Sequence, residues 1–292
     1  MSPTRSLLLK FLVLAAAGIL RAESNEALAV SSRTSDDYVR TRRADGSLLP
    51  EPYAFGRGGL WTGATGGDAI GRLDFTTIAG TIAGPLAAQN YVPAKDPATT
   101  RLLIMVYWGV TRAPEHAAGL PGYQLMQSAT EQMSMARAHG DKGEMLEADS
   151  LMSSAASAVA VENQRRSRIN LQNAQILGYE SWWRSTAVLS GTVYGHLRLQ
   201  DLLDELEEDR YFVVLMAYDF QLLWKHNQKK LLWETRFSMR ERGNDFGGQL
   251  AAMTRGASRY FGRSSDGLTH QAFPEGRVEV GTARTLEYVP QK

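Results

Sequence analysis

The chain contains no cysteine among its 292 residues. Disulfide bonds, thiol nucleophiles and cysteine-ligated metal sites are therefore excluded together. A chain of this length can bury enough apolar surface to fold without such cross-links. The histidines are widely separated and form no His-x-x-x-His or His-x-His pair, so we expect no metal and no cofactor; they are His116, His139, His196, His226 and His270.

Motifs that bind nucleotides or activate a serine are also missing. In the glycine-rich stretch 51–68, Gly67 is followed by Asp68, where a phosphate-binding loop requires lysine and then serine or threonine. Trp61 stands where a dinucleotide-binding motif that begins at Gly56 would need its third glycine. No Gly-x-Ser-x-Gly sequence occurs, so no catalytic residue is assigned. We predict a glycine-rich turn or edge strand on which Trp61 packs.

Neither sign of charge dominates the chain, which has 32 basic and 31 acidic residues. Loss of residues 1–22 would remove three basic residues and no acidic ones, leaving 29 basic residues against 31 acidic residues. Proteins that bind nucleic acid carry a basic excess or a dense basic patch. We therefore expect no nucleic-acid partner.

An apolar run close to the N-terminus has the features of a secretory signal. Arg5 and Lys10 precede the run Phe11–Leu20, and the small residue Ala22 follows it. The run is shorter than the roughly 20 residues of a membrane-spanning helix. Residues 1–22 are predicted to be a cleaved signal peptide, with an uncleaved anchor as the alternative. Because no cysteine follows the run, a lipoprotein anchor is excluded, and we expect a periplasmic or secreted protein without a transmembrane segment.

The next segment, residues 23–50, is rich in serine, threonine, aspartate and arginine and has few large apolar residues. Such a composition buries little surface to offset the entropy of ordering. We predict a disordered polar segment here. Residues 51–292 are predicted to form a single α/β domain, interrupted by a helical insert at 112–210.

The stretch 211–240 is predicted to be a long antiparallel hairpin at the centre of a sheet. Two apolar, β-branched and aromatic runs flank the polar residues Lys225–Lys230, which is typical of strands joined by a short solvated turn. Tyr211–Ala217 is almost continuously apolar, so both faces of this strand should be covered.

Other periodicities complete the predicted domain. Helices are expected at 74–90 and 245–261, an interior strand at 101–111 and an edge strand at 276–289. The fold class is therefore predicted as α/β (α+β), with a mixed, largely antiparallel sheet around a central hairpin. Helices should pack on this sheet, and the insert should add a long helical hairpin.

The insert itself is rich in alanine, methionine, glutamine, glutamate and leucine. Segments 123–139 and 144–177 are predicted to form a helical hairpin, because glycines separate two stretches of strong helix formers. A third helix is predicted within 182–210. It ends in the acidic run 204–209, which we interpret as a solvated helix end.

The second helix of the insert carries an apolar stripe that includes Met145, Met152 and Val159 at alternating three- and four-residue spacing. Such a stripe is more often core than partner groove, but methionine is also enriched at adaptable binding surfaces. We therefore hypothesise an interaction surface at these residues. Its partner would be an envelope protein or a second copy, bound through the insert residues 123–177.

One carboxylate looks out of place in the predicted hairpin. Asp219 lies between Tyr218 and Phe220 in the apolar first strand, where an unpaired charge would be costly. It can be explained by pairing with Arg236 across the hairpin or by a bulge, but a ligand-binding carboxylate would stand out in the same way. Trp61, Asp219 and Arg236 are the candidate ligand-binding residues.

Three segments carry a resemblance of layout to known proteins. They are Gln89–Pro93 (QNYVP) at the end of a helix, the strand Leu102–Trp108, and Lys230–Thr235 (KLLWET) before a helix. Their order after a signal peptide resembles that of uncharacterised exported envelope proteins and lipoproteins of Gram-negative bacteria. The chain departs from the lipoproteins by lacking the anchor cysteine and by carrying the helical insert. The resemblance implies an envelope location and no enzymatic activity.

Two functional hypotheses follow. The first is a non-catalytic exported envelope protein that acts through protein–protein interaction or self-association. The alternative is a periplasmic small-ligand-binding protein or an unrecognised hydrolase, with its site at the glycine-rich stretch and the sheet edge.

Overall fold

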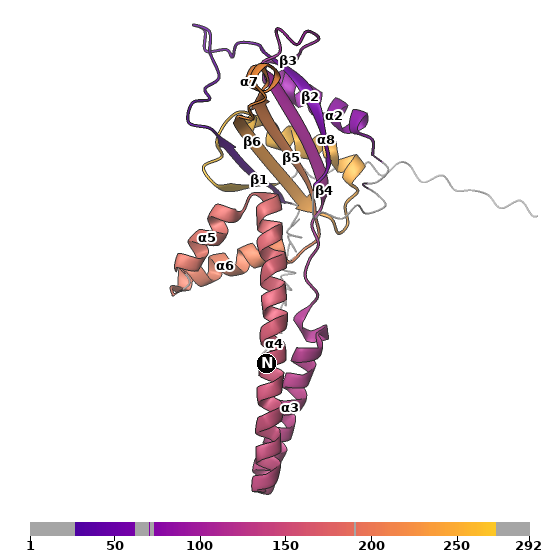
Figure 1. The fold of residues 1–292 in the computed structure, drawn as a ribbon, viewed down its shortest axis with the longest axis vertical. Helices are drawn as coiled ribbons and strands as arrows, with labels where there is room; N and C mark the ends of the chain where they lie inside the picture. Colours follow the sequence, from indigo (N-terminus) through magenta and orange to yellow (C-terminus); the bar gives the residue numbers. More distant parts are fainter. Residues whose placement is uncertain (1–26, 62–69, 71–72, 190, 273–292) are drawn as a thin grey trace, which may run out of the picture.

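The computed structural model describes residues 27–61, 70, 73–189 and 191–272 (Figure 1). The predicted signal peptide at 1–22 and the predicted edge strand at 276–289 lie outside these residues. Within them, an α/β body carries a long helical projection that extends from one end of the sheet (Figure 1).

A mixed sheet forms the centre of the body. Its seven strands among the described residues have the order β3-β2-β4-β5-β6-β1-β7. β2 pairs in parallel with β3 and β4, and the other neighbours are antiparallel. This confirms the predicted mixed, largely antiparallel sheet. The strands are β1 (Ala27–Thr34), β2 (Glu51–Leu60), β3 (Tyr91–Pro93), β4 (Leu102–Val110), β5 (Arg210–Asp219), β6 (Leu231–Arg240) and β7 (Leu268–Ala272).

The predicted hairpin is confirmed as β5 and β6, which lie in the middle of the sheet. Its connection is longer than predicted, because residues that were expected to extend the first strand form α7 (Phe220–His226). The Asp219 side chain accepts a hydrogen bond from the Leu222 backbone N–H at 3.0 Å and so caps this helix. Asn227, with a φ of 51°, ends it in the left-handed conformation.

In two segments the structure contains strands that the sequence analysis did not predict or placed at the sheet edge. The segment 23–50, predicted to be disordered, contains β1, which pairs with β6 on one side and β7 on the other. The glycine-rich stretch contains β2, which is an interior strand and not an edge. Position 58 requires glycine, because the ring of Tyr107 packs directly over its backbone. A Cβ there would lie 2.4 Å from a ring carbon.

One face of the sheet is covered by α2 (Phe75–Ala88) and α8 (Phe246–Ala257), which confirms the two helices predicted around them. Asp74 and Asp245 cap them through their side chains. Trp233 of β6 is fully buried on this face, with its ring 5.9 Å from that of Tyr91 and 6.1 Å from that of Phe261. This face holds the larger hydrophobic core.

The insert covers the opposite face and confirms the predicted helical hairpin. The predicted third helix is two helices, α5 and α6, which branch away beside the body (Figure 1). The last residues of α4, together with Leu202 and Leu206 of α6, form a second core with Phe212 and Val214 of β5. The insert consists of a short 3₁₀ turn (Ala117–Gly119), α3 (Pro121–His139), α4 (Lys142–Leu177), α5 (Glu180–Leu189) and α6 (Val193–Leu206).

The helical projection, here called the arm, comprises α3 and the part of α4 beside it, residues 121–163. The two helices run antiparallel with an apolar seam at alternating three- and four-residue spacing, which is the repeat of a coiled coil. Buried alanines in both helices let the backbones approach closely. The seam residues are Gly122, Met126, Ala129, Met133 and Ala136 of α3, and Met145, Ala148, Met152, Ala155, Val159 and Glu162 of α4.

The seam predicts that a larger side chain destabilises the arm only at positions that face the seam. Ala155 is fully buried, whereas its neighbour Ala156 is exposed. Ala155→Leu should overpack the seam and destabilise the arm by about 1–3 kcal/mol, whereas Ala156→Leu should change little. The measurement is urea unfolding followed by helical circular dichroism. Equal stability of the two variants would contradict the coiled-coil seam.

Candidate functional site

The structure separates the three residues predicted to bind a ligand. Arg236 lies beside Trp61, with its guanidinium carbon 5.0 Å from the centre of the indole ring. Asp219 lies elsewhere: it is opposite Leu102 in the sheet, whereas Arg236 is opposite Val214. Asp219 caps α7 at the end of the body away from the arm (Figure 1). The pairing of Asp219 with Arg236 that we considered is therefore absent.

Arg236 connects the sheet to the arm helix. Its Nη1 donates hydrogen bonds to the backbone oxygens of Gln175 at 2.6 Å and Ile176 at 2.8 Å, near the C-terminal end of α4. Its Nε donates to Glu234 Oε1 at 2.8 Å. A cation at a helix C-terminus satisfies carbonyls that have no partner within the helix. The contact of Arg236 with α4 and Glu234 is called the clamp below.

The buried carboxylate of the clamp is held in its charged form. Burial acts to raise the pKa of Glu234, but the hydrogen bond and charge of Arg236, together with Arg33, outweigh burial. The pKa of Glu234 therefore lies below its ordinary value. Arg33 contributes from the surface, with its side chain 69% exposed and its Nε 3.3 Å from Glu234 Oε1.

A polar cleft of about 570 Å³ opens beside the clamp. Hydroxyl groups of Ser31, Ser181 and Ser264 line it together with the guanidinium groups of Arg33 and Arg184. These groups can hydrogen-bond a polar ligand. The carboxylates of Glu180 and Glu234 also line this cleft.

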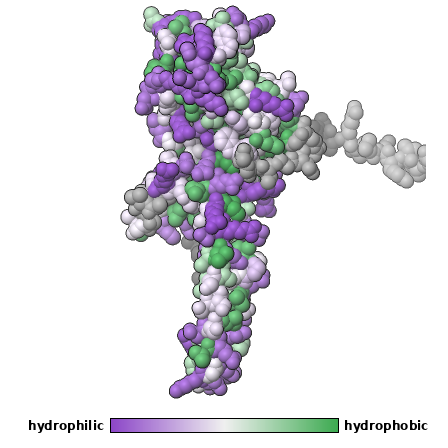
Figure 2. Space-filling model, viewed as in Figure 1, coloured by the Kyte–Doolittle hydropathy of each residue, from purple (hydrophilic) through white to green (hydrophobic). Residues whose placement is uncertain are grey.

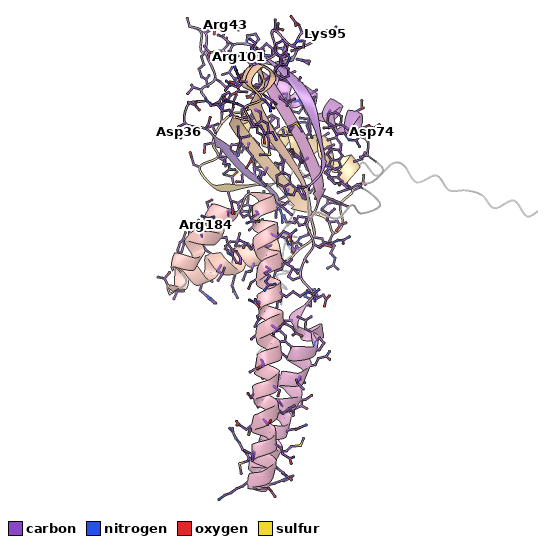
Figure 3. All side chains as sticks on the ribbon, viewed as in Figure 1. Asp36, Arg43, Asp74, Lys95, Arg101 and Arg184 are labelled. Carbon is purple, nitrogen blue, oxygen red and sulfur yellow. The ribbon has the colours of Figure 1, made fainter. Side chains whose placement is uncertain are left out.

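Asp219 lines a different cavity, of about 340 Å³, at the α7 end of the body. Four of its charged groups form two pairs: Lys230 contacts Asp37, and Arg40 lies 3.0 Å from Glu51 while stacking on Tyr91. Figure 3 shows Arg101 near α7 and Arg184 on α5 at opposite ends of the body. The two cavities therefore cannot form one site.

Sequence reasoning missed a polar network that joins α6 to the last described strand. Glu205 Oε1 lies within hydrogen-bonding distance of His270 Nε2 on β7, and Tyr179 donates to Glu205 Oε2 at 2.8 Å. Burial acts to raise the pKa of Glu205, but His270 and Arg210 outweigh it, so the pKa is lowered. The acidic run 204–209 is thus not simply solvated. In the sequence, the only sign of this network is the high density of carboxylates next to Arg210.

Other carboxylates of this run also bind arginines. Glu207 accepts a hydrogen bond from Arg166 of α4 at 2.6 Å, and Glu208 accepts one from Arg240 of β6 at 2.7 Å. In the part of the chain that the structure describes, no three His, Asp or Glu side chains are grouped closely enough to hold a metal ion. Glu208 thereby joins the insert to the sheet, and Glu207 joins the end of α6 to α4.

The structure places Met145, Met152 and Val159 in the seam of the arm, where they are half-buried against α3. Within the arm, the exposed large apolar side chains of α4 are instead Leu146, 74% exposed, and Val161, 68% exposed. Between them, Ser150–Val161 contains no charged residue. Figure 2 shows the corresponding middle of the arm as mainly white and green, with purple gathered at its tip and its base.

No protein-family model matches this chain, and a search of curated proteins finds no similar sequence. Across the residues with a described structure, no helix is both long enough and apolar enough to cross a membrane.

The clamp predicts that Arg236 and Arg33, which bind the same carboxylate, contribute very differently to the free energy of unfolding. Arg236→Met should cost about 3–5 kcal/mol in unfolding free energy, because it leaves Glu234 buried without its main partner and the end of α4 without a donor. Arg33→Met should cost less than about 1 kcal/mol, because Arg33 is largely solvated. Urea unfolding measures both. A similar cost for both variants would contradict the clamp.

Glu234 also predicts a pH dependence of stability. Because its pKa is lower in the folded than in the unfolded protein, its contribution is fully present above the unfolded pKa near 4.5. The contribution is lost as the pH falls through the folded pKa. The stability difference between the wild-type protein and Glu234→Gln should therefore shrink as the pH falls below 4.5. Urea unfolding at a series of pH values measures it, and a constant difference would contradict this assignment.

Proposed function

We propose that the protein is a non-catalytic exported protein of the cell envelope that binds another protein chain through its arm. The observation that supports this most is the exposed, charge-free surface of α4 from Ser150 to Val161 on a projection that leaves the body (Figures 1 and 2). A solvated helix normally carries charged residues on its exposed face. An uncharged surface of small and apolar residues favours packing against another helix.

The attachment of the arm supports the same proposal. The clamp fixes the base of α4 to the body, and the bond between Arg166 and Glu207 fixes α4 to the end of α6. A rigid base holds the arm in one direction, which reduces the entropy lost when a partner binds. The location in the envelope rests on the signal-like segment 1–22 and on the resemblance to exported proteins.

The alternative, a small-ligand-binding protein or hydrolase, has support only from the polar cleft beside the clamp. Arg236, the candidate that lines this cleft, already uses its Nε and Nη1 donors within the protein. Trp61 packs edge-to-face on Tyr107, with ring centres 4.9 Å apart. Both residues therefore have structural roles, and we favour the arm.

The proposal is tested by removing the arm while keeping its base. Tyr123 and Asn163 are joined by a hydrogen bond of 2.6 Å between their side chains, so residues 124–160 can be replaced by a short Gly/Ser linker without moving the ends apart. The remaining part of α4 keeps its contacts with Glu207 and Arg236. Affinity capture from the cell envelope should recover a protein chain with the intact protein and not with the linker variant.

A control and an opposing outcome complete this test. Urea unfolding of the strands should be similar in both proteins, because the linker leaves the body intact. Recovery of the same chains by the linker variant would contradict the proposed role of the arm.

A further inference from the structure

The polar cleft beside the clamp is built from four segments that lie far apart in the sequence. Ser31 and Arg33 of β1 lie opposite Arg236 of β6 and Glu234 of β6, respectively. The junction between α4 and α5 and the turn before β7 complete the lining. Its volume of about 570 Å³ falls within the range of about 300–1,000 Å³ that is typical of small-molecule sites. The cleft is therefore large enough to hold a small ligand.

Arg236 supplies this cleft with a donor that the clamp does not use. Its Nε and Nη1 are bound to Glu234 and to α4, whereas its Nη2 has no hydrogen bond to any described residue. Arg236 is only 8% exposed, yet Nη2 is not among the fully enclosed polar atoms that lack a partner. Because Arg236 lines the cleft, an anionic oxygen bound there would give Nη2 a charge-assisted hydrogen bond.

The N-terminal end of α5 faces the same cleft, since Glu180 and Ser181 line it. Tyr179, the residue before this helix, does not cap it, because its hydroxyl group donates to Glu205. The backbone N–H of Trp182, in the first turn, has no acceptor among the described residues. Free N–H groups at a helix N-terminus attract negative charge. The helix thus adds to the attraction that Arg236 exerts on an anion.

The charged side chains around the cleft leave a small positive excess. Three guanidinium groups line it, those of Arg33, Arg184 and Arg236, against the two carboxylates of Glu180 and Glu234. Both carboxylates are already paired: Glu234 binds Arg236 and Arg33, and Glu180 lies 3.6 Å from Arg184. One positive charge remains uncompensated. This balance favours a ligand with a single negative charge over one with two.

Hydroxyl groups account for much of the remaining polar lining. The hydroxyl of Ser181 has no hydrogen-bond partner among the described residues, and it lies in the first turn of α5. Ser264 accepts a hydrogen bond from the backbone N–H of Asp266, so its own O–H remains able to donate. Together with the Glu180 carboxylate, these groups can bind hydroxyl groups of a ligand.

We propose that this cleft binds a small monocarboxylate that carries hydroxyl groups. The ligand carboxylate lies between Arg236 Nη2 and the first turn of α5, and the ligand hydroxyl groups contact Ser181, Ser264 and Glu180. A phosphate dianion is disfavoured, because the lining offers one excess positive charge and holds two carboxylates. The site goes beyond the proposed function and does not depend on it, since no residue of the arm lines the cleft.

Isothermal titration calorimetry of the protein without residues 1–22 tests the ligand class. The probes are D-gluconate and D-glucuronate, with D-glucose as the uncharged control and inorganic phosphate as the control for anions in general. We expect at least one of the two acids to bind at least tenfold more tightly than glucose and phosphate. Absence of binding by both acids overturns the proposal, and so does equal affinity for either control.

Ser181→Asp tests the position of the site without weakening the fold. Aspartate in the first turn of α5 is favourable for the helix but places a negative charge where the ligand carboxylate should lie. Binding of the acid should weaken at least tenfold. Ser153→Asp is the matched control: it changes the net charge equally on an exposed position of the arm and should leave the affinity unchanged. Circular dichroism checks that both variants keep their helices.

The remaining outcomes separate this site from the proposed function. Undiminished binding by Ser181→Asp, or an equal loss in Ser153→Asp, overturns the placement in this cleft. The variant in which a linker replaces residues 124–160 should bind the acid like the intact protein, because it retains the whole cleft. Loss of acid binding in that variant overturns the independence of the site from the arm. Failure to capture a protein chain, with acid binding retained, overturns the proposed function alone.

Discussion

One buried arginine, Arg236, fixes the C-terminal end of α4 to the sheet. Arg236 comes from the central hairpin of the sheet and donates to the last backbone oxygens of α4, which would otherwise lack partners. Glu234 orients it, and the chain turns away at Gly178, whose φ of 81° is open to glycine. A Cβ at Gly178 would lie 2.9 Å from Arg236 Cδ, so the turn and the arginine depend on one another. This contact acts together with the second hydrophobic core to hold the base of the arm against the sheet.

The arm itself combines two surfaces of opposite character. Its seam buries alanine and methionine between two antiparallel helices and makes the projection stable as a coiled coil. The side of α4 opposite the seam leaves Leu146 and Val161 in solvent, and Ser150–Val161 carries no charge. The body provides a rigid support with two hydrophobic cores, one on each face of the sheet. The body and the seam provide stability, and the proposed recognition is assigned to the exposed side of α4.

The sequence predicted the elements whose side chains alternate or repeat strongly. The hairpin, the helices on either side of it and the helical hairpin of the insert were predicted correctly, because each buries an apolar face of its own. β1 was missed because its interior position depends on backbone pairing with β6 and β7. Small residues such as Ala29 and Ser32 can occupy this position, so the segment lacks the large apolar side chains that indicate an interior strand. The α7 helix was missed because apolar residues hid the capping role of Asp219. The clamp could not be predicted, since it joins Arg236 to backbone oxygens some 60 residues away in the sequence.

The central claim is that the arm is the part of this protein that other chains cover. Hydrogen–deuterium exchange of the protein without residues 1–22, at low and high concentration and with envelope extract, tests this most directly. The account predicts slower exchange in peptides from 142–165 when a partner or a second copy is present, with no change in β5 and β6. Exchange in the arm that is the same under all three conditions would contradict it.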